Sequence, residues 1–108
     1  DVLMAQFDVY ENPSKATRKA YPYILEIQND VIEQIATRIV VPLADYAQMS
    51  NEELKGLTPK TSYEDKELLI LIPQVASMST KSLKHPVGTL VHLRDEIISA
   101  LDFAITGI

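Results

Sequence analysis

The sequence predicts a mainly β domain, a small barrel or sandwich, that ends in a C-terminal α-helix. Several short segments have the alternating or β-branched composition of strands, and turn residues separate them. Residues 91–108 instead repeat apolar side chains at steps of three and four, the period of an amphipathic helix. With 108 residues and 46% hydrophobic content, the chain is predicted to form a single domain with its own core.

Three strands are predicted in the first half of the chain, over residues 6–10, 21–28 and 37–43. In the first of them, strict alternation directs Phe7 and Val9 inward. The second contains Pro22, which has no backbone N–H, so that strand is expected to begin at a sheet edge. The third is rich in β-branched residues and is predicted to be a buried strand that ends near Pro42.

The second half alternates turns with short extended segments. Ser50 and Glu53 have the spacing of a capping box, which predicts a short helix or helical turn at that point. Residues 64–66 are expected to turn a hairpin, and the unbroken apolar run at 68–72 predicts a strand covered on both faces. Further predictions are short extended pieces at residues 74–78 and 79–83, and a turn at 85–88.

The terminal helix is predicted to carry an apolar stripe and a second, outward set of residues. The stripe consists of Leu90, Leu93, Ile97, Ala100, Leu101, Ala104 and Ile108. Ile98 and Ile105 lie on its shoulder with Asp102 beyond them, and Phe103 points about 120° away from the stripe. A surface helix of a monomer has little reason to direct such apolar side chains outward, which indicates a docking surface.

Gly107 and Ile108 end the chain and have two interpretations. In the first, Gly107 adopts the left-handed conformation of a helix C-cap and Ile108 folds back on the last turn. In the second, the helix shoulder and the tail together form the docking surface. Because glycine is so common at helix ends, the pattern alone favours the C-cap.

Composition restricts the class of protein. Fifteen acidic against ten basic residues give a net charge of −5, which argues against nucleic-acid binding by the chain alone. The chain has no cysteine, no apolar run long enough to span a membrane and no evident signal peptide, so a cytoplasmic protein is expected. Met4 is the expected natural start, with residues 1–3 a leader or an added segment.

The sequence predicts no catalytic residue, metal or cofactor. The three glycines are too scattered for a phosphate-binding loop, and His85 and His92 lack metal-ligand spacing. Carboxylate pairs at residues 52–53 and 95–96 are expected on solvated helix faces. Ribonuclease chemistry would need an arginine and a general base, drawn from Arg18, Arg38 or His85, which the sequence does not force together.

Several segments, in their order and spacing, resemble the CcdB family of plasmid and chromosomal toxins, which poison DNA gyrase. The matching pieces are residues 6–10, 27–32, 37–44, 75–78, 95–98 and 106–108. The resemblance implies an SH3-like barrel with a C-terminal helix that forms a symmetric homodimer. It also implies an antitoxin of the CcdA type, whose disordered C-terminal part wraps the toxin. The toxin and the antitoxin together would repress their own operon. Such a toxin is not an enzyme; it binds the gyrase A subunit and traps the cleaved DNA complex.

The resemblance further implies which residues contact gyrase: Thr106, Gly107, Ile108, Ile105, Asp102, Val31 and Ile32. These overlap the outward set found from periodicity, which makes a docking surface the better interpretation of the tail. The family pattern has an aromatic residue where this chain has Thr106. An aromatic anchor buries more area, so its loss should weaken such a contact by a few kcal/mol unless something compensates.

Two alternative functions remain open from the sequence. One is a ribonuclease toxin of the MazF and Kid group, which has the same type of barrel. It ranks second because the matching segments point to CcdB and the acidic charge disfavours RNA. The other is an inactive remnant that keeps only its binding to an antitoxin.

Overall fold

A computed structural model describes residues 5–29 and 36–107. Within these residues seven strands form one antiparallel sheet, and a single long helix follows the last strand. The strands are β1 (Asp8–Glu11), β2 (Tyr23–Glu26), β3 (Thr37–Asp45), β4 (Lys60–Tyr63), β5 (Lys66–Ile70), β6 (Ala76–Ser79) and β7 (Gly88–Thr89). The helices are α1 (Tyr46–Met49) and α2 (Arg94–Thr106), with 3₁₀ turns η2 (Ser50–Glu52), η3 (Ile72–Gln74), η4 (Thr80–Ser82) and η5 (Val91–Leu93).

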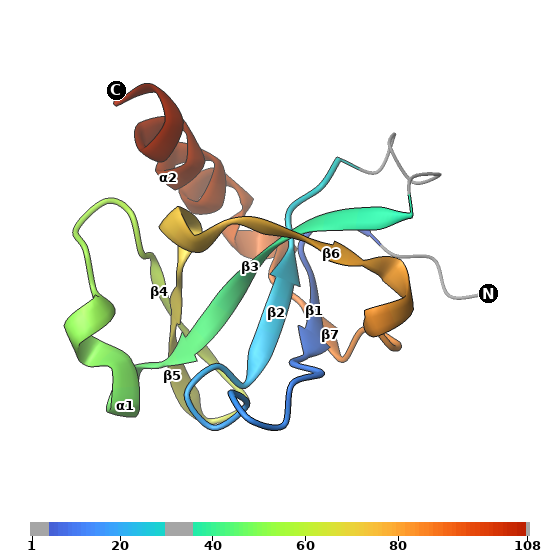
Figure 1. The fold of residues 1–108 in the computed structure, drawn as a ribbon. Helices are drawn as coiled ribbons and strands as arrows, with labels where there is room; N and C mark the ends of the chain where they lie inside the picture. Colours follow the sequence, from blue (N-terminus) through green and yellow to red (C-terminus); the bar gives the residue numbers. More distant parts are fainter. Residues whose placement is uncertain (1–4, 30–35, 108) are drawn as a thin grey trace.

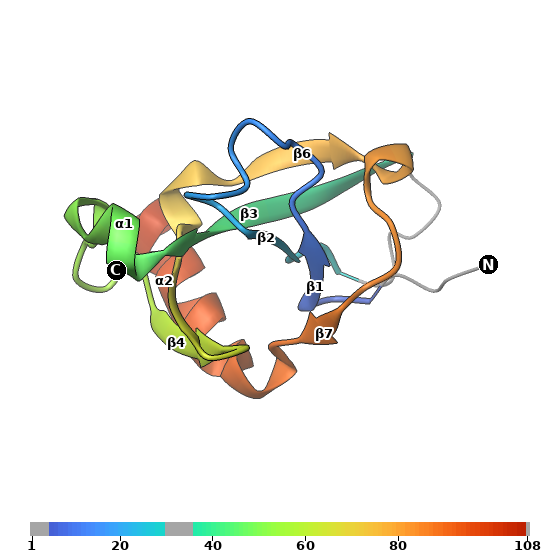
Figure 2. The same ribbon diagram turned by 90° about the horizontal axis from the view of Figure 1, so that it is seen from below.

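The sheet curls into an incomplete barrel, with α2 packed beside it (Figures 1 and 2). Its strand order is β4-β5-β3-β2-β1-β7, and β6 pairs with the outer part of β3. The predicted fold class is therefore confirmed: the protein is mainly β with a C-terminal helix, consistent with an SH3-like barrel. None of the helices in the described residues is long and apolar enough to cross a membrane.

Strand β3 is the longest described strand, and on one side its hydrogen-bonded partner strand changes halfway along its length. On one side it pairs with β2, while on the other side residues 37–40 pair with β6 and residues 43–45 pair with β5. The prediction that this strand ends near Pro42 is wrong, because Pro42 lies inside it. The Pro42 carbonyl accepts a hydrogen bond from Leu71 on the side where the neighbours change. The missing N–H therefore falls in the gap between two ladders, where no partner strand requires it.

The prediction of a sheet edge at Pro22 is also wrong. Strand β2 begins one residue later and lies between β1 and β3, in the interior of the sheet. Pro22 precedes the strand, and its carbonyl accepts a hydrogen bond from the backbone of Asn12. Tyr21 likewise lies outside the strand, and its ring packs on a separate apolar cluster with Tyr46 and Met49.

The main core lies between the concave face of the sheet and α2. Phe7 and Val9 point into it as predicted, and so do Ile97 and Ala100 of the helix stripe. The other members of this buried cluster are Leu25, Val41, Leu43, Leu68, Ile70, Ile72 and Leu90. Residues 68–72 are all buried, which confirms a strand covered on both faces. Ala104, at the end of the predicted stripe, is exposed because α2 extends past the barrel.

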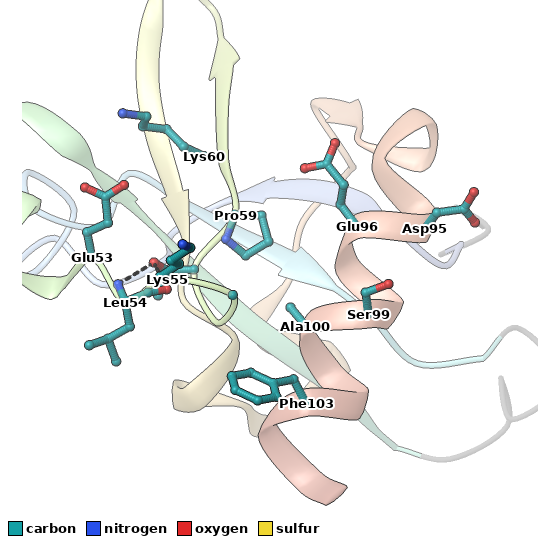
Figure 3. A pocket seen from close by; sticks show the side chains of 12 residues that line it. Glu53, Leu54, Lys55, Pro59, Lys60, Asp95, Glu96, Ser99, Ala100 and Phe103 are labelled. Atoms are coloured by element: carbon teal, nitrogen blue, oxygen red, sulfur yellow. Dashed lines mark hydrogen bonds between the residues drawn. The ribbon is translucent and has the colours of Figure 1, made fainter. Parts of the chain in front are cut away.

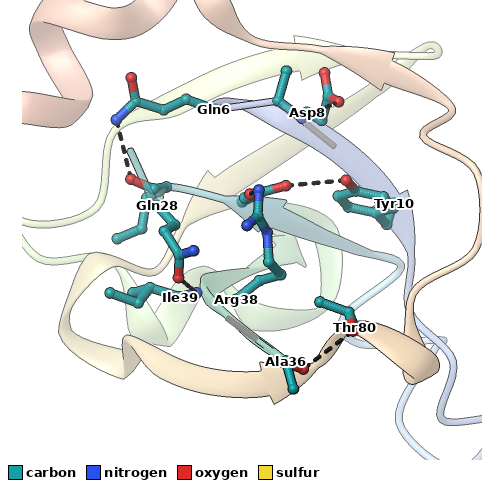
Figure 4. A network of polar contacts seen from close by, with 11 residues as sticks. Gln6, Asp8, Tyr10, Gln28, Ala36, Arg38, Ile39 and Thr80 are labelled. Atoms are coloured by element: carbon teal, nitrogen blue, oxygen red, sulfur yellow. Dashed lines mark hydrogen bonds and ion pairs between the residues drawn. The ribbon is translucent and has the colours of Figure 1, made fainter. Parts of the chain in front are cut away.

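The opposite face of β1, β2 and β3 is also buried, which simple alternation did not predict. Tyr10, Ile24, Val40 and Leu83 form a second apolar cluster there. A charged pair lies beside it: the guanidinium of Arg38 contacts the carboxylate of Glu26 at 2.5 Å, and both side chains are at most 1% exposed (Figure 4). The Tyr10 hydroxyl donates to the same carboxylate at 3.0 Å. Burial raises the pKa of Glu26, against the opposing effects of Tyr10 and Arg38.

Replacing Arg38 by methionine should leave a buried carboxylate without its cation. We expect a loss of about 3 kcal/mol in the free energy of unfolding at pH 7, measured by urea denaturation. Because the folded-state pKa of Glu26 would lie above its ordinary 4.5, the ionised form is penalised only at higher pH. The deficit should therefore shrink as the pH falls from 7 to 5. The double variant Glu26→Gln with Arg38→Met should show little of this pH dependence, and equal pH profiles for both variants would contradict the argument.

The hairpin between β4 and β5 is confirmed, and its tip closes the barrel. Glu64 and Asp65 both have positive φ, the geometry of a two-residue turn that suits the twist of the strands. The preceding Tyr63 donates its hydroxyl to the carbonyl of Val87 at 3.1 Å, which joins the hairpin to the chain entering β7. Gly88 is necessary at this seam, because a Cβ there would coincide with the Tyr63 hydroxyl and lie 2.9 Å from the ring carbon that carries it.

Gly88→Ala should therefore open the seam. We expect a loss of about 2 kcal/mol in the free energy of unfolding, because the ring of Tyr63 must move and its hydrogen bond is lost. Tyr63→Phe alone should cost about 1 kcal/mol. The double variant should lose less free energy of unfolding than the sum of the two single losses, because both changes break the same contact. Fully additive losses in urea denaturation would contradict that contact.

The capping box at Ser50 does not form. The helical segment begins earlier, at Tyr46, because the carboxylate of Asp45 accepts from the backbone N–H of Ala47 at 3.1 Å. Ser50 instead starts the 3₁₀ turn η2, and Glu53 follows its end.

Candidate functional site

Helix α2 is held at its base and free at its tip. Asp95 and Glu96 in its first turn complement the positive N-terminal end of the helix dipole. At the other end, Gly107 has φ of 75° and donates its N–H to the carbonyl of Phe103 at 2.9 Å. The predicted left-handed C-cap at Gly107 is thus confirmed. This cap does not exclude a docking role, because it fixes the backbone and leaves the side chains of the last turn exposed.

The last turn of α2 brings together the described residues predicted to contact gyrase. Ile105 is 78% exposed, and Asp102, Thr106 and Gly107 are exposed beside it. The Thr106 hydroxyl donates to the carbonyl of Asp102 at 2.6 Å, so the helix itself uses this polar group. We call these four residues the helix tip. The other three predicted residues, Val31, Ile32 and Ile108, lie outside the described residues.

One side of α2 borders an apolar groove, which we call the β3-side groove. It has a volume of about 490 Å³ and lies between the end of the helix, η3, the outer part of β3 and Leu57 of the loop before β4. Its lining residues are Ile27, Ile39, Leu57, Ile72, Pro73, Val75, Leu101, Ala104 and Ile105. Two large aliphatic side chains in this groove, Ile39 of β3 and Val75 just before β6, are 42% and 44% exposed. All the lining side chains are apolar, so this groove is suited to an apolar partner surface.

The other side of α2 borders a second, wider groove of about 900 Å³, which we call the loop-side groove. Phe103 and Ala100 project from the helix toward Leu54 and Pro59 of the loop before β4 (Figure 3). Leu54 and Phe103 are 51% and 42% exposed. The structure thus locates Phe103, singled out by periodicity, in this groove.

Thr58 gives the loop-side groove its shape. Its side-chain oxygen accepts from the N–H of Leu54 at 2.8 Å and donates to the carbonyl of the same residue at 3.1 Å. Gly56, with φ of 79°, lets the loop turn beneath the ring of Phe103. The shape of this loop could not be predicted from the sequence, because Gly56 was the signal noted there and the capping box predicted just before it does not form.

The rim of the loop-side groove is mainly acidic. Glu53, Asp95 and Glu96 line it, against Lys55 and Lys60. The ammonium of Lys60 lies 4.3 Å from the centre of the Tyr46 ring, in a cation–π contact that holds it on the β4 side of the groove. A partner with basic side chains around an apolar anchor would therefore fit this rim best.

The groups considered for chemistry are dispersed or buried. His85 and His92 are exposed, while Arg38 is 1% exposed and paired with Glu26. In residues 5–29 and 36–107, no three histidine, aspartate or glutamate side chains are grouped to hold a metal ion. What the described surface does offer is an exposed helix tip flanked by two apolar grooves.

A curled antiparallel sheet with such a terminal helix defines a small barrel protein whose candidate sites are surfaces for contact with other macromolecules. Comparison with protein families gives the particular family: a model described as CcdB protein matches residues 6–107. The match covers nearly the whole chain, so the chain belongs to the CcdB family. It is therefore the toxin of a toxin–antitoxin system, with an antitoxin as its partner.

Proposed function

We propose that this toxin binds the A subunit of DNA gyrase through its helix tip and traps the cleaved gyrase–DNA complex. The observation that carries the proposal is Ile105, a large aliphatic side chain that is 78% exposed on the last turn of α2. Although Ile105 borders the β3-side groove, most of its side chain remains open to solvent. Membership of the CcdB family gives the target class, because that family poisons gyrase.

Poisoning of this kind requires no catalytic group. The toxin must bind the cleaved conformation of gyrase more tightly than the others, since only differential affinity shifts a conformational population. Ile105 supplies an apolar anchor, and Asp102 a charge that orients the contact. Thr106 contributes mainly its methyl group, because its hydroxyl is hydrogen-bonded to the helix backbone. Val31, Ile32 and Ile108 remain proposed contacts. The target also implies a cytoplasmic protein.

A chain ending at Ile105 should lose gyrase trapping while remaining folded. The deletion removes only exposed described residues, Thr106 and Gly107, together with Ile108. Ile105→Ala in the full chain should reduce trapping about tenfold or more, the size expected for loss of a buried aliphatic anchor. The assay is accumulation of double-strand breaks when purified gyrase, ATP and supercoiled plasmid are incubated with the protein.

Phe103→Ala is the matched control, because it removes an exposed apolar side chain from the same helix on the loop-side groove. It should leave trapping unchanged. Full trapping by the chain that ends at Ile105 would exclude residues 106–108 from the contact, and full trapping by Ile105→Ala as well would exclude the helix tip as the site. Absence of breaks with the intact protein, together with intact antitoxin binding, would instead support an inactive remnant.

We propose that a second copy of the chain covers the β3-side groove. Ile39 lies on β3, Val75 immediately precedes β6, which pairs with β3, and Ile105 borders the same groove. A two-fold interface buries the same patch of both protomers, so one self-complementary apolar face is sufficient. Because the groove adjoins the helix tip, such a dimer would carry both tips on one assembly. It could then engage a two-fold gyrase opening with both at once.

Val75→Asp should dissociate this dimer, because each interface would bury two unpaired carboxylates. We expect the mass measured by sedimentation equilibrium to fall from that of two chains to that of one. Val91→Asp is the matched control, since Val91 is 54% exposed and lies outside the groove. A change of mass in the control, or none in Val75→Asp, would argue against this face.

We assign the loop-side groove to the antitoxin. Its apolar floor and acidic rim suit an amphipathic segment that places an apolar side chain against Phe103 and basic side chains around it. Since this groove and the β3-side groove lie on opposite sides of α2, antitoxin binding is compatible with the dimer. Phe103→Ala should weaken antitoxin binding under conditions in which it leaves gyrase trapping intact.

The ribonuclease alternative lacks support from the site. A ribonuclease would need its arginine at the surface to contact RNA, whereas Arg38 is buried and paired. Arg18 donates its Nε to the backbone carbonyl of Asn12, a role in holding a loop.

A further inference from the structure

A small cavity lies at the seam where the barrel closes. The β4–β5 turn, which contributes to it, is at the end of the sheet away from the C-terminus of α2 (Figure 1). It has a volume of about 290 Å³ and is lined by Glu11, Tyr23, Tyr63, Glu64 and Val87. These residues come from the end of β1, the start of β2, the hairpin turn and the chain before β7. We call it the seam cavity. It shares no lining residue with either groove beside α2.

The seam cavity is lined by negative charge with no cation to balance it. Glu11 and Glu64 are exposed, and within the described residues neither forms an ion pair. No lysine, arginine or histidine is among the lining residues. An open pair of carboxylates alone would be an ordinary solvated surface. The aromatic side chains beside them distinguish this one.

Tyr23 and Tyr63 form an edge-to-face pair, with ring centres 5.1 Å apart and planes at 79°. The Tyr63 hydroxyl donates to the Val87 carbonyl, which fixes that ring at the wall. Burial raises the pKa of both tyrosines, and the nearby charge of Glu64 raises both further. Glu11 adds to the effect at Tyr23. Both rings are therefore neutral at physiological pH, and both carboxylates direct their negative potential into the same space.

We propose that the seam cavity binds the guanidinium group of an arginine side chain from a peptide partner. A guanidinium can stack on an aromatic ring while its N–H groups donate to carboxylates, and the seam cavity supplies both kinds of group. A compact ammonium would use the charges and leave the flat rings less fully covered. A divalent metal ion is disfavoured, because two carboxylates provide too few oxygen ligands. The inference is independent of the gyrase proposal.

The rigid seam makes this site preorganised. The β4–β5 turn, which carries Glu64, is fixed through Tyr63 to the chain before β7, so little order must be gained on binding. Because the helix tip lies at the far end of the barrel, a peptide held at the seam cavity would leave the tip accessible.

The test is an NMR titration of the intact protein with N-acetyl-arginine amide, using N-acetyl-citrulline amide as the neutral isostere. We expect saturable shifts of the signals of Tyr23, Tyr63 and Glu64 with the arginine compound, and much smaller shifts with citrulline. Combining Glu11→Gln with Glu64→Gln should weaken binding about tenfold, which corresponds to 1.4 kcal/mol. Tyr23→Leu should also weaken it, and Tyr23→Phe should not.

Glu67→Gln is the matched control, since it removes an exposed carboxylate from β5 outside the seam cavity. It should bind arginine as the parent does. Equal binding of citrulline, or unchanged binding by the double glutamine variant, would overturn the proposal. Tighter binding of tetramethylammonium than of the arginine compound would overturn the assignment to arginine. Gyrase trapping should be unchanged in the double variant, so failure of either proposal can be recognised separately.

Discussion

The change of neighbour along β3 is the constraint on which the rest of the structure depends. One strand cannot bond to β5 and β6 at the same position, so the sheet must divide between residues 40 and 43. Proline occupies the dividing point, where its missing N–H leaves no donor unpaired. The chain returns from β5 to β6 through η3, which lies beside α2 and forms part of the β3-side groove. The backbone that lets the sheet curl into a barrel therefore also creates the groove assigned to dimerisation.

Helix α2 adds three separate exposed surfaces to the small barrel: the helix tip and a groove along each side of the helix. Its buried residues, Ile97 and Ala100, fix its base on the core, and this leaves two sides and a tip exposed. One groove is formed mainly with β3 and η3 and the other with the loop before β4, although Leu57 of that loop also lines the first. The two grooves have no lining residue in common. This separation suits a toxin that must bind an antitoxin as well as its target.

The sequence predicted those features that depend on neighbouring residues. The helix followed from periodicity, the hairpin from its turn residues and the covered strand from an unbroken apolar run. Ile105 and Asp102 of the helix tip were found because they did not fit the stripe, and Thr106 and Gly107 from the family resemblance. Burial of Glu26 could not be predicted, because its partners Arg38 and Tyr10 lie on other strands. The capping box failed because Asp45 caps the helical segment first. The grooves and the seam cavity were invisible for the same reason: each joins segments far apart in the chain.

Thr106 stands where the family resemblance leads us to expect an aromatic residue. The apolar contact area lost by this difference can be supplied by another side chain in the same turn of the helix. An aromatic anchor replaced by threonine should weaken a contact by a few kcal/mol. Burying a fully accessible isoleucine contributes about 2 kcal/mol, and Ile105 starts from 78% exposure. The two quantities are of similar size. The bond from the Thr106 hydroxyl to the Asp102 carbonyl also removes the desolvation cost that a free hydroxyl would add to an apolar contact. In the proposed gyrase contact, Ile105 would therefore take over the role of the anchor, and Thr106 would contribute its methyl group while its hydroxyl stays bonded to the helix.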